Sequence, residues 1–263
     1  MPQTTSKELK LAVLIDADNV PYSNVKGMME EIAKYGTPTT KRIYADWTKP
    51  NANGWKSVLL EHAITPIQQY SYTVGKNSSD SALIIDAMDL LYSDKVDGFC
   101  IVSSDSDFTR LAIRLRESGM KVIGMGEKKT PNPFIVSCDR FIFIEVLEGA
   151  IKTKKAKPVV LAPVTDTKGS KKTADKEAVV KVDSKTIELI EDTIDAIGDD
   201  DGWAFLGDVG NLIVKKKPEF DPRSYGFNKL TPLLKSLTDI LEIDERDSDK
   251  RGIKHVYVRL RYT

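Results

Sequence analysis

The sequence is poor in cysteine and has no long hydrophobic run. Its two cysteines, Cys100 and Cys138, lie in no Cys-x-x-Cys or Cys/His pattern, which argues against a zinc site or a disulfide framework. No apolar run approaches the ~20 residues that a membrane-spanning helix needs, and the first residues, MPQTTSKELK, lack the apolar region of a signal peptide. Because sparse thiols suit a reducing compartment, we expect a cytoplasmic protein with no membrane partner.

Acidic and basic residues are balanced, at 39 each. The overall charge therefore predicts no polyanionic partner, and any basic surface has to be local. Lysine is most concentrated in residues 151–183, which contain KTKKAK and KGSKK and no aromatic residue. A segment of this composition buries little apolar surface, so we expect a flexible linker. It divides the 263 residues into a first domain, 1–150, and a second, 184–263.

The first domain alternates short apolar runs with helical patterns. Strands are expected at 11–15, 42–45, 64–68, 99–102, 121–124 and 140–144, and helices at 25–35, 55–62, 80–92 and 108–117. The runs LAVLI and FCIV are apolar without alternation, which is typical of strands buried on both faces of a parallel sheet. The order of the elements predicts an α/β domain with a mostly parallel sheet flanked by helices.

Three helices followed by a hairpin are expected in the second domain. The helical patterns cover 186–197, 205–214 and 229–237, and LEID and HVYVRL are two strands joined by the polar loop ERDSDKRG. In HVYVRL the two valines and the leucine alternate with the other residues, so one face of the strand is apolar. This order outlines a small winged-helix domain of the α+β class.

Acidic side chains directly follow two of the expected strands. Asp16, Asp18 and Asn19 come after LAVLI, and Asp105 and Asp107 come after FCIV. In open parallel sheets, binding sites form outside the carboxyl ends of the strands. We therefore expect both groups at one edge of the sheet.

Asp80 is a third acidic contribution. It lies in the first turn of the helix expected at 80–92, on the same face as the apolar residues of that helix, whereas Asp86 and Asp89 are expected on the opposite, polar face. A carboxylate that faces a sheet costs free energy, and a helix N-terminus offsets only a few tenths to about 1 kcal/mol of it. A bound cation would offset far more.

Ligands that are all oxygen favour Mg²⁺ or Mn²⁺ over zinc. Such an ion lowers the pKa of water and stabilises charge on a phosphodiester during an in-line displacement. We expect Asp16 and Asp105 to bind the metal. Asp80 and Asp107 complete the expected site, directly or through water. Asn19 is expected to orient the scissile phosphate or a water molecule.

Helix capping is the ordinary alternative for these residues. An aspartate after a strand often caps the next helix, and Ser104, Ser106 and Asp107 are all candidate caps. For any single residue, capping is at least as good an explanation as metal binding, and for Asp18 it is the better one. The convergence of three separated segments on one edge is what favours a metal site.

Three segments of the first domain resemble one known family. LIDADNVP, KNSSDSALIIDAMDLL and IVSSDSDFTRLAIRLRESGMKVIGMG are similar to NYN domains, a PIN-like nuclease group that includes bacterial LabA-like proteins. The resemblance covers about residues 8–148. It implies a PIN-like α/β fold and a metal-dependent ribonuclease, a hydrolase of RNA. The acidic positions and the asparagine of the family correspond here to Asp16, Asp80, Asp105, Asp107 and Asn19.

The C-terminal stretch resembles a second family. GWAFLGDVGNLIVKKKPEFDPRSYGFNKLTPLLKSL, followed by LEIDER and HVYVRL, is similar to the OST-HTH/LOTUS domain over about residues 184–263. The similarity rests mainly on Gly207, Pro218, Phe220, Tyr225, Gly226 and Leu230. It implies a winged-helix module that binds RNA or a protein partner.

Several basic and aromatic residues are candidates for contacts with single-stranded RNA. In the polar loop before Asp80, Lys76 can meet a phosphate and Tyr72 can stack on a base. Arg110 follows the acidic pair at the start of the next helix. In the second domain the candidates are Lys215, Lys216, Lys217 and Arg223. The alternative is that these charges complement a helix dipole and are solvated.

Two other functions fit parts of the sequence. DADNV matches the DxDx(T/V) pattern of haloacid-dehalogenase-like phosphatases, in which Asp16 would be the nucleophile and Asp18 the acid/base. The strand-end Ser/Thr motif, the lysine and the late acidic pair of that family do not follow in order here. A non-catalytic RNA-binding adaptor with a nuclease fold is the other alternative.

Overall fold

The computed structural model describes residues 8–70, 78–147, 182–247 and 254–261. By their contacts the residues form two compact units, which are Met1–Glu148 with Gly210–Phe220, and Gly149–Val209 with Asp221–Thr263. Nearly all of the expected linker, 151–183, lies outside the described residues. Within the described ranges, no helix is both long enough and apolar enough to cross a membrane.

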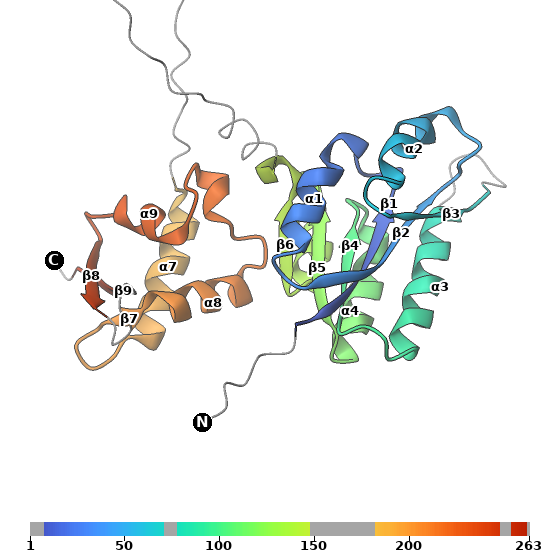
Figure 1. Cartoon of the computed structure of the whole chain (residues 1–263). Helices are drawn as coiled ribbons and strands as arrows, with labels where there is room; N and C mark the ends of the chain where they lie inside the picture. The colour runs from blue at the N-terminus through green and yellow to red at the C-terminus, as the bar shows by residue number, and fades with distance from the viewer. Residues whose placement is uncertain (1–7, 71–77, 148–181, 248–253, 262–263) are drawn as a thin grey trace, which may run out of the picture. The chain divides into compact units, whose positions relative to one another are not determined.

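Six parallel strands form the sheet of the first unit (Figure 1). They are β1 Lys10–Asp16, β2 Thr37–Ala45, β3 Thr65–Gln68, β4 Gly98–Val102, β5 Lys121–Gly126 and β6 Arg140–Phe143. Their order is β3-β2-β1-β4-β5-β6, and every pairing is parallel. The strand order reverses between β1 and β4, so the carboxyl ends of these two strands border the crevice where such sheets bind ligands.

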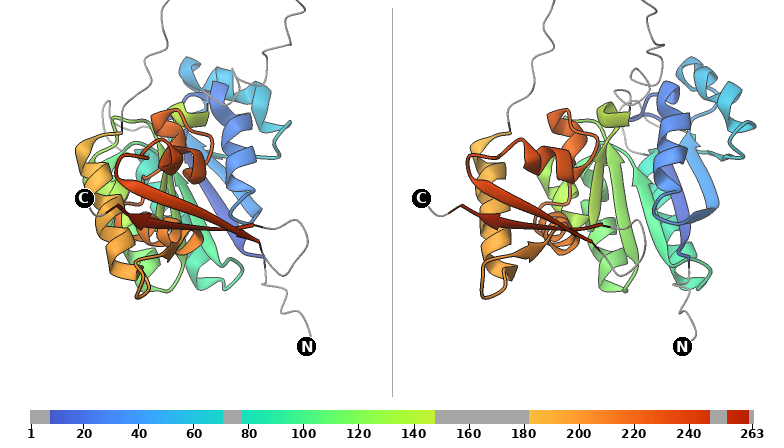
Figure 2. Two further views of the ribbon diagram at one scale, coloured as in Figure 1. Left: turned by 90° about the vertical axis from the view of Figure 1, so that its left-hand side faces the viewer. Right: turned by 60° about the vertical axis from the view of Figure 1, so that its left-hand side comes forward.

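Helices cover both faces of this sheet (Figures 1 and 2). Helices α1 Val25–Ile32 and α2 Asn53–Leu59 pack on one face. The other face is covered by α3 Ser78–Tyr92, α4 Thr109–Glu117 and α5 Asn132–Ser137. Short 3-10 turns precede α1, α2 and α4 at Tyr22–Asn24, Pro50–Ala52 and Ser106–Phe108. The predicted α/β fold with flanking helices is confirmed.

The central strands are buried on both faces, as their unbroken apolar sequence predicts. Residues 11–15 of β1 and 99–102 of β4 are all 0% exposed. Successive side chains enter opposite cores, since Leu14 packs with α3 and α4 whereas Ile15 packs with α1 and α2. Two differences from expectation concern local signals. Helix α5 was not predicted, because its six residues are too few to show a helical period. Strand β2 begins at Thr37, and its first half was not predicted because the residues there are polar and only partly buried.

The C-terminal elements form a small group of helices with an antiparallel sheet, which confirms the predicted α+β outline. The helical segments are α7 Ser184–Ile197, α8 Leu206–Lys216, the 3-10 turn Pro222–Tyr225 and α9 Leu230–Lys235. The strands are β7 Ala204–Phe205, β8 Leu241–Asp247 and β9 Lys254–Leu260, in the order β7-β9-β8. Strand β7 is an addition to the predicted hairpin.

The two faces of this sheet differ in character. Val258 and its partner Ala204 are 0% and 1% exposed, so their face belongs to the core. On the other face the guanidinium of Arg259 lies 4.6 Å from the ring centroid of Trp203, and that of Arg246 lies 4.2 Å from the ring centroid of Tyr257. These cation–π contacts order the outer side chains of the hairpin.

Candidate metal centre

The carboxyl ends of β1 and β4 place two polar segments side by side. Ile15 pairs with Val102 in the parallel register, so Asp16 and Ser103 are the next residues on neighbouring strands. The Ser103 hydroxyl donates a hydrogen bond to Oδ2 of Asp16 at 2.7 Å. Asp105 follows two residues later. The segments that contain the predicted site residues therefore meet where the strand order reverses.

Three carboxylates meet at this edge. One carboxylate oxygen from each of Asp80, Asp105 and Asp107 lies within 4.8 Å of the other two. Asp80 is buried, Asp105 is half-buried and Asp107 is exposed, so the cluster lies at the boundary between core and solvent. Asp80 belongs to the first turn of α3, whereas the other two follow β4. Tertiary packing thus brings distant segments together.

The electrostatics of the cluster show that Asp16 also acts on it. Burial, followed by the negative charges of Asp16, Asp105 and Asp107, raises the pKa of Asp80 to about 7 from its ordinary value of 3.8. Two carboxylates about 5 Å apart repel each other by about 3 kcal/mol at an effective dielectric constant of about 20. Without a cation, the cluster therefore retains a proton close to neutral pH.

Asp16 is held in one orientation by three hydrogen bonds. Its Oδ2 accepts from the Asn19 side-chain amide and from the Ser103 hydroxyl, both at 2.7 Å, and its Oδ1 accepts from the backbone N–H of Asp18 at 3.2 Å. The side chain is buried, which raises its pKa, while the hydrogen bonds from Asn19 and Ser103 oppose that rise. Asn19 thus contacts Asp16 directly, and Oδ1 of Asp16 retains a lone pair for a further partner.

Asp105 caps the 3-10 turn that precedes α4. Its Oδ1 accepts a hydrogen bond from the backbone N–H of Asp107 at 2.9 Å. Its own N–H donates to the Ser103 hydroxyl at 3.0 Å. The cap expected from Ser104, Ser106 or Asp107 is therefore supplied by Asp105. Capping does not preclude metal binding, because a carboxylate offers about four lone-pair positions.

Two serines that the sequence analysis did not assign to the site connect its strands. Ser103 is 0% exposed and links Asp16 to the backbone of Asp105 through a single hydroxyl. The Ser104 hydroxyl accepts from the N–H of Glu127 at 2.9 Å, which ties the end of β4 to the end of β5. The sequence signal that could have identified Ser103 and Ser104 is their position, as two hydroxyl residues directly after the apolar strand FCIV.

We predict that Ser103→Ala weakens the binding of Mn²⁺ about 10- to 100-fold, because it removes a group that orients Asp16 and Asp105. The free energy of unfolding should fall by about 1.5–3 kcal/mol, since a buried hydrogen bond to a charged group is lost. Titration calorimetry with Mn²⁺ and urea denaturation measure the two effects. The control is Ser104→Ala, which removes a structural hydrogen bond and should leave the Mn²⁺ affinity unchanged. Equal Mn²⁺ affinities for both variants would contradict a role for Ser103 in the site.

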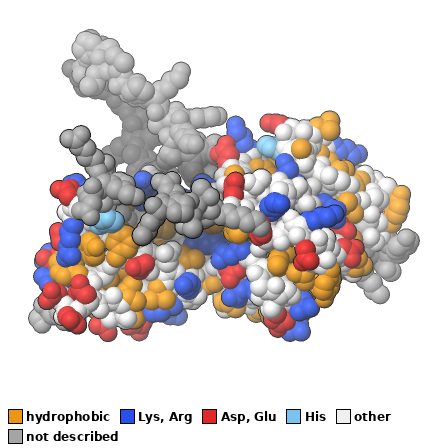
Figure 3. Space-filling model, turned by 60° about the horizontal axis from the view of Figure 1, so that its bottom comes forward, with side chains coloured by type: hydrophobic (Ala, Val, Ile, Leu, Met, Phe, Trp, Pro, Cys, Tyr) orange, Lys and Arg blue, Asp and Glu red, His pale blue; other side chains and the backbone are white. Residues whose placement is uncertain are grey.

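The predicted RNA-contact residues have different surroundings. Tyr72 and Lys76 lie outside the described residues. Arg110 is exposed on α4. On the face of the molecule in Figure 3, basic and acidic side chains are intermixed rather than gathered by sign.

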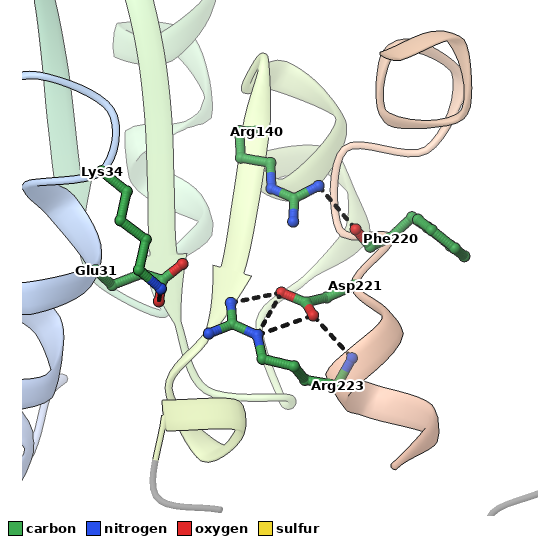
Figure 4. Close-up of polar contacts among 6 residues, drawn as sticks. All are labelled: Glu31, Lys34, Arg140, Phe220, Asp221 and Arg223. Atoms are coloured by element: carbon green, nitrogen blue, oxygen red, sulfur yellow. Dashed lines mark hydrogen bonds and ion pairs between the residues drawn. The ribbon is translucent and has the colours of Figure 1, made fainter. Parts of the chain in front are cut away.

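The predicted basic residues at the end of α8 and in the 3-10 turn after it differ in how exposed they are. Lys215 and Lys216 are exposed in its last turn, and Lys217 is half-buried just beyond it. Arg223 is less exposed, and its guanidinium binds the Asp221 carboxylate with a shortest distance of 2.7 Å (Figure 4). Exposure therefore favours Lys215 and Lys216 over Arg223 as phosphate contacts.

Figure 4 also shows the Glu31–Lys34 ion pair of the first unit, whose atoms lie 2.6 Å apart.

The acidic cluster has the chemistry of a site for a hard divalent cation. Its side chains offer only carboxylate oxygen, which Mg²⁺ and Mn²⁺ prefer and which zinc sites usually supplement with nitrogen or sulfur. Burial and the neighbouring negative charges together raise the pKa of Asp80, as is common for a carboxylate at a functional site. The residues present therefore fit such an ion.

Comparison with known proteins gives two family matches. The model of the NYN domain matches residues 10–145, and that of the OST-HTH/LOTUS domain matches residues 179–253. No curated protein matches the chain.

Several solved structures are similar to parts of the chain. A crystal structure of a protein of unknown function from Vibrio parahaemolyticus is 21% identical, with a TM-score of 0.43, and the match covers 52% of this chain and 94% of that one. A solution structure of an uncharacterized protein from Nitrosomonas europaea is 31% identical, with coverages of 38% and 94% and a TM-score of 0.29. A solution structure from Chromobacterium violaceum is 33% identical, with coverages of 32% and 89% and a TM-score of 0.25.

The NYN match spans about half of the 263 residues and includes every acidic residue of the cluster. It runs from the first residue of β1 to just beyond β6, so it covers the whole parallel sheet. The OST-HTH/LOTUS match covers α7 to β8 and ends before β9. The chain therefore belongs to the NYN-domain family, and it carries an OST-HTH/LOTUS domain after its NYN domain.

Proposed function

We propose that this protein is a metal-dependent ribonuclease that hydrolyses phosphodiester bonds of single-stranded RNA. An NYN domain implies a nuclease-type fold, and an OST-HTH/LOTUS domain implies RNA binding. The observation that carries the proposal is the meeting of Asp80, Asp105 and Asp107 beside Asp16, at the point where the strand order reverses.

Asp16, Asp80, Asp105 and Asp107 are proposed to hold Mg²⁺ or Mn²⁺. Such an ion, when bound, stabilises negative charge on the phosphate and lowers the pKa of water. Asn19 and Ser103 orient Asp16 through the two hydrogen bonds to its Oδ2. Burial of Asp16 and Asp80 keeps bulk water from screening the charges at the site.

The rest of the chain is proposed to bind RNA. Tyr72, Lys76 and Arg110 are the candidates near the acidic site. Lys215, Lys216 and Lys217, with Arg223, are those of the C-terminal domain, whose ligand is RNA or a protein partner. We place the domains at 1–150 and 184–263, with a lysine-rich linker between them. Two free, buried cysteines are compatible with a reducing cytoplasm.

The proposal predicts that cleavage requires a divalent metal. The purified full chain should cut end-labelled single-stranded RNA in Mg²⁺ or Mn²⁺, should stop in EDTA, and should recover when the metal is restored. Gel electrophoresis of the products measures this. RNA binding without cleavage in any divalent metal would point to a non-catalytic adaptor.

Asp18→Asn is an informative companion variant. The Asp18 side chain is exposed, and its backbone N–H donates to Oδ1 of Asp16. Cleavage should be weakened yet retained in this variant. A complete loss would favour the acid/base role that a haloacid-dehalogenase-like phosphatase assigns to this position.

A further inference from the structure

Helix α3, which carries Asp80, is bound to the sheet by a polar contact at its middle. The Tyr44 hydroxyl of β2 donates to Oδ2 of Asp86 at 2.8 Å, and Nη1 of Arg42 lies 2.9 Å from the same oxygen. We call Arg42, Tyr44 and Asp86 the α3 anchor. The sequence predicts Asp86 on the polar face of α3, but in the structure its side chain is only 25% exposed and faces β2.

Tyr44 lies beside the acidic site in the sheet. It pairs with Asp16 in the parallel register of β1 and β2, and its carbonyl accepts from the N–H of Ala17 at 3.2 Å. Its ring is 0% exposed and packs in the core with Leu14 and Leu83. Burial and the neighbouring Asp86 raise the pKa of the Tyr44 hydroxyl above its ordinary range, so the hydroxyl remains a donor. One residue therefore contacts both the end of β1 and helix α3.

The remaining contacts of α3 with the sheet are mainly apolar. Leu83, Ala87, Leu90 and Leu91 are buried against it. Apolar contacts have little directional preference, so they resist sliding of a helix along its axis less than a hydrogen bond does. Asp86 follows Asp80 by six residues, which is about 9 Å along a helix. A helix is stiff over this length, and a restraint on Asp86 therefore also restrains Asp80.

Such a restraint is needed because the carboxylates repel each other. Asp80 is near Asp16, Asp105 and Asp107, all of which act to push the first turn of α3 away from the end of the sheet. The α3 anchor opposes this movement from a point outside the cluster.

We propose that Tyr44 is a positioning residue of the metal site. Through Asp86 it holds α3 at one height on the sheet, and so it sets the distances from Asp80 to Asp105 and Asp16. This inference rests on the proposed function, because it assumes that the carboxylates bind a divalent cation.

Calorimetric titration of the full chain with Mn²⁺ alone tests the proposal. Tyr44→Phe removes one hydroxyl, leaves the charge unchanged and keeps the ring in the core. It should weaken Mn²⁺ binding about tenfold or more, as the loss of an outer-shell partner does. The matched control is Tyr92→Phe, which removes an exposed hydroxyl at the other end of α3, where Arg114 donates to it. This variant should bind Mn²⁺ like the wild type.

A second pair of variants keeps the proposal testable if Tyr44→Phe does not fold. Asp86→Ala and Asp86→Asn remove the same charge, but only asparagine retains an oxygen that accepts from Tyr44. Alanine should weaken Mn²⁺ binding at least as much as Tyr44→Phe, and asparagine should restore most of the affinity.

The outcomes separate this inference from the proposed function. If the wild type binds no Mn²⁺, both fail. If the wild type binds Mn²⁺ and Tyr44→Phe binds it equally well, the ribonuclease proposal stands and the role of Tyr44 is overturned. The role of Tyr44 would also be overturned if Tyr44→Phe had a lower melting temperature in EDTA but an unchanged Mn²⁺ affinity. A residue with a purely structural role behaves in this way.

Discussion

Asp105→Asn is expected to slow RNA cleavage by at least about a hundredfold. Removal of an outer-shell partner commonly costs 10- to 100-fold in metal affinity or activity, so the loss of a direct ligand should cost more. The fold should survive, because asparagine is as good a cap as aspartate and its oxygen can still accept from the N–H of Asp107. The measurement is the initial rate of cleavage at saturating Mn²⁺.

Asp94→Asn provides the matched control for this variant. Asp94 is exposed, outside the acidic cluster, and has a φ of 53°, a conformation that asparagine also tolerates. The Asp94→Asn variant makes the same chemical change as Asp105→Asn and should cleave RNA at the wild-type rate. A variant at Asp105 that cuts as fast as this control would remove Asp105 from the proposed ligand set.

The second large effect is expected from Asp80→Asn, which should stabilise the metal-free protein while impairing metal binding. In the folded chain the pKa of Asp80 is raised to about 7, against 3.8 ordinarily. Between these values the folded state binds more protons than the unfolded state, so stability falls as the pH rises. Asparagine carries no charge and avoids this loss, which amounts to up to about 4 kcal/mol above pH 7.

Urea denaturation in EDTA at pH 4 and pH 8 measures the effect of Asp80→Asn. The variant should have a larger free energy of unfolding than the wild type at pH 8. The difference should nearly vanish at pH 4, where Asp80 is protonated in the folded state and close to half protonated in the unfolded state. Added Mn²⁺ should stabilise the wild type at pH 8 much more than the variant. The control is Asp89→Asn, because Asp89 is exposed on the same helix. Equal stabilities of Asp80→Asn and the wild type at pH 8 would show that burial and the neighbouring carboxylates do not raise the pKa of Asp80 as described.

Part of the candidate site was predictable because it depends on local patterns. LAVLI and FCIV are too apolar for strands with a solvated face, so a buried parallel sheet follows from them. Polar residues directly after such strands must lie at their carboxyl ends, which places Asp16 and Asp105 at one edge. Helical periodicity similarly places Asp80 on the face that α3 turns toward the sheet.

Helical periodicity did not predict the surroundings of residues at the edge of the buried face of α3. It predicts Asp86 on the polar face, yet Asp86 contacts Tyr44 and Arg42 on a strand more than 40 positions away. The hydrophobic pattern describes the centre of a buried face, but it does not show how far a neighbouring strand extends beneath its border. The engagement of Arg223 by Asp221 was missed for a different reason: the two residues are only two positions apart, but a charged residue near a helix end was expected to face solvent.

The sequence alone determined the class of fold, the two family resemblances and the acidic residues available at the strand ends, because each depends on order and spacing along the chain. Tertiary structure decided the strand order, the closeness of Asp80 to Asp105 and Asp107, and the hydrogen bonds of Ser103 and Tyr44. The physical reason is that these contacts join side chains from different strands and helices. Their geometry is set by how the sheet and its helices pack, and no local pattern specifies it.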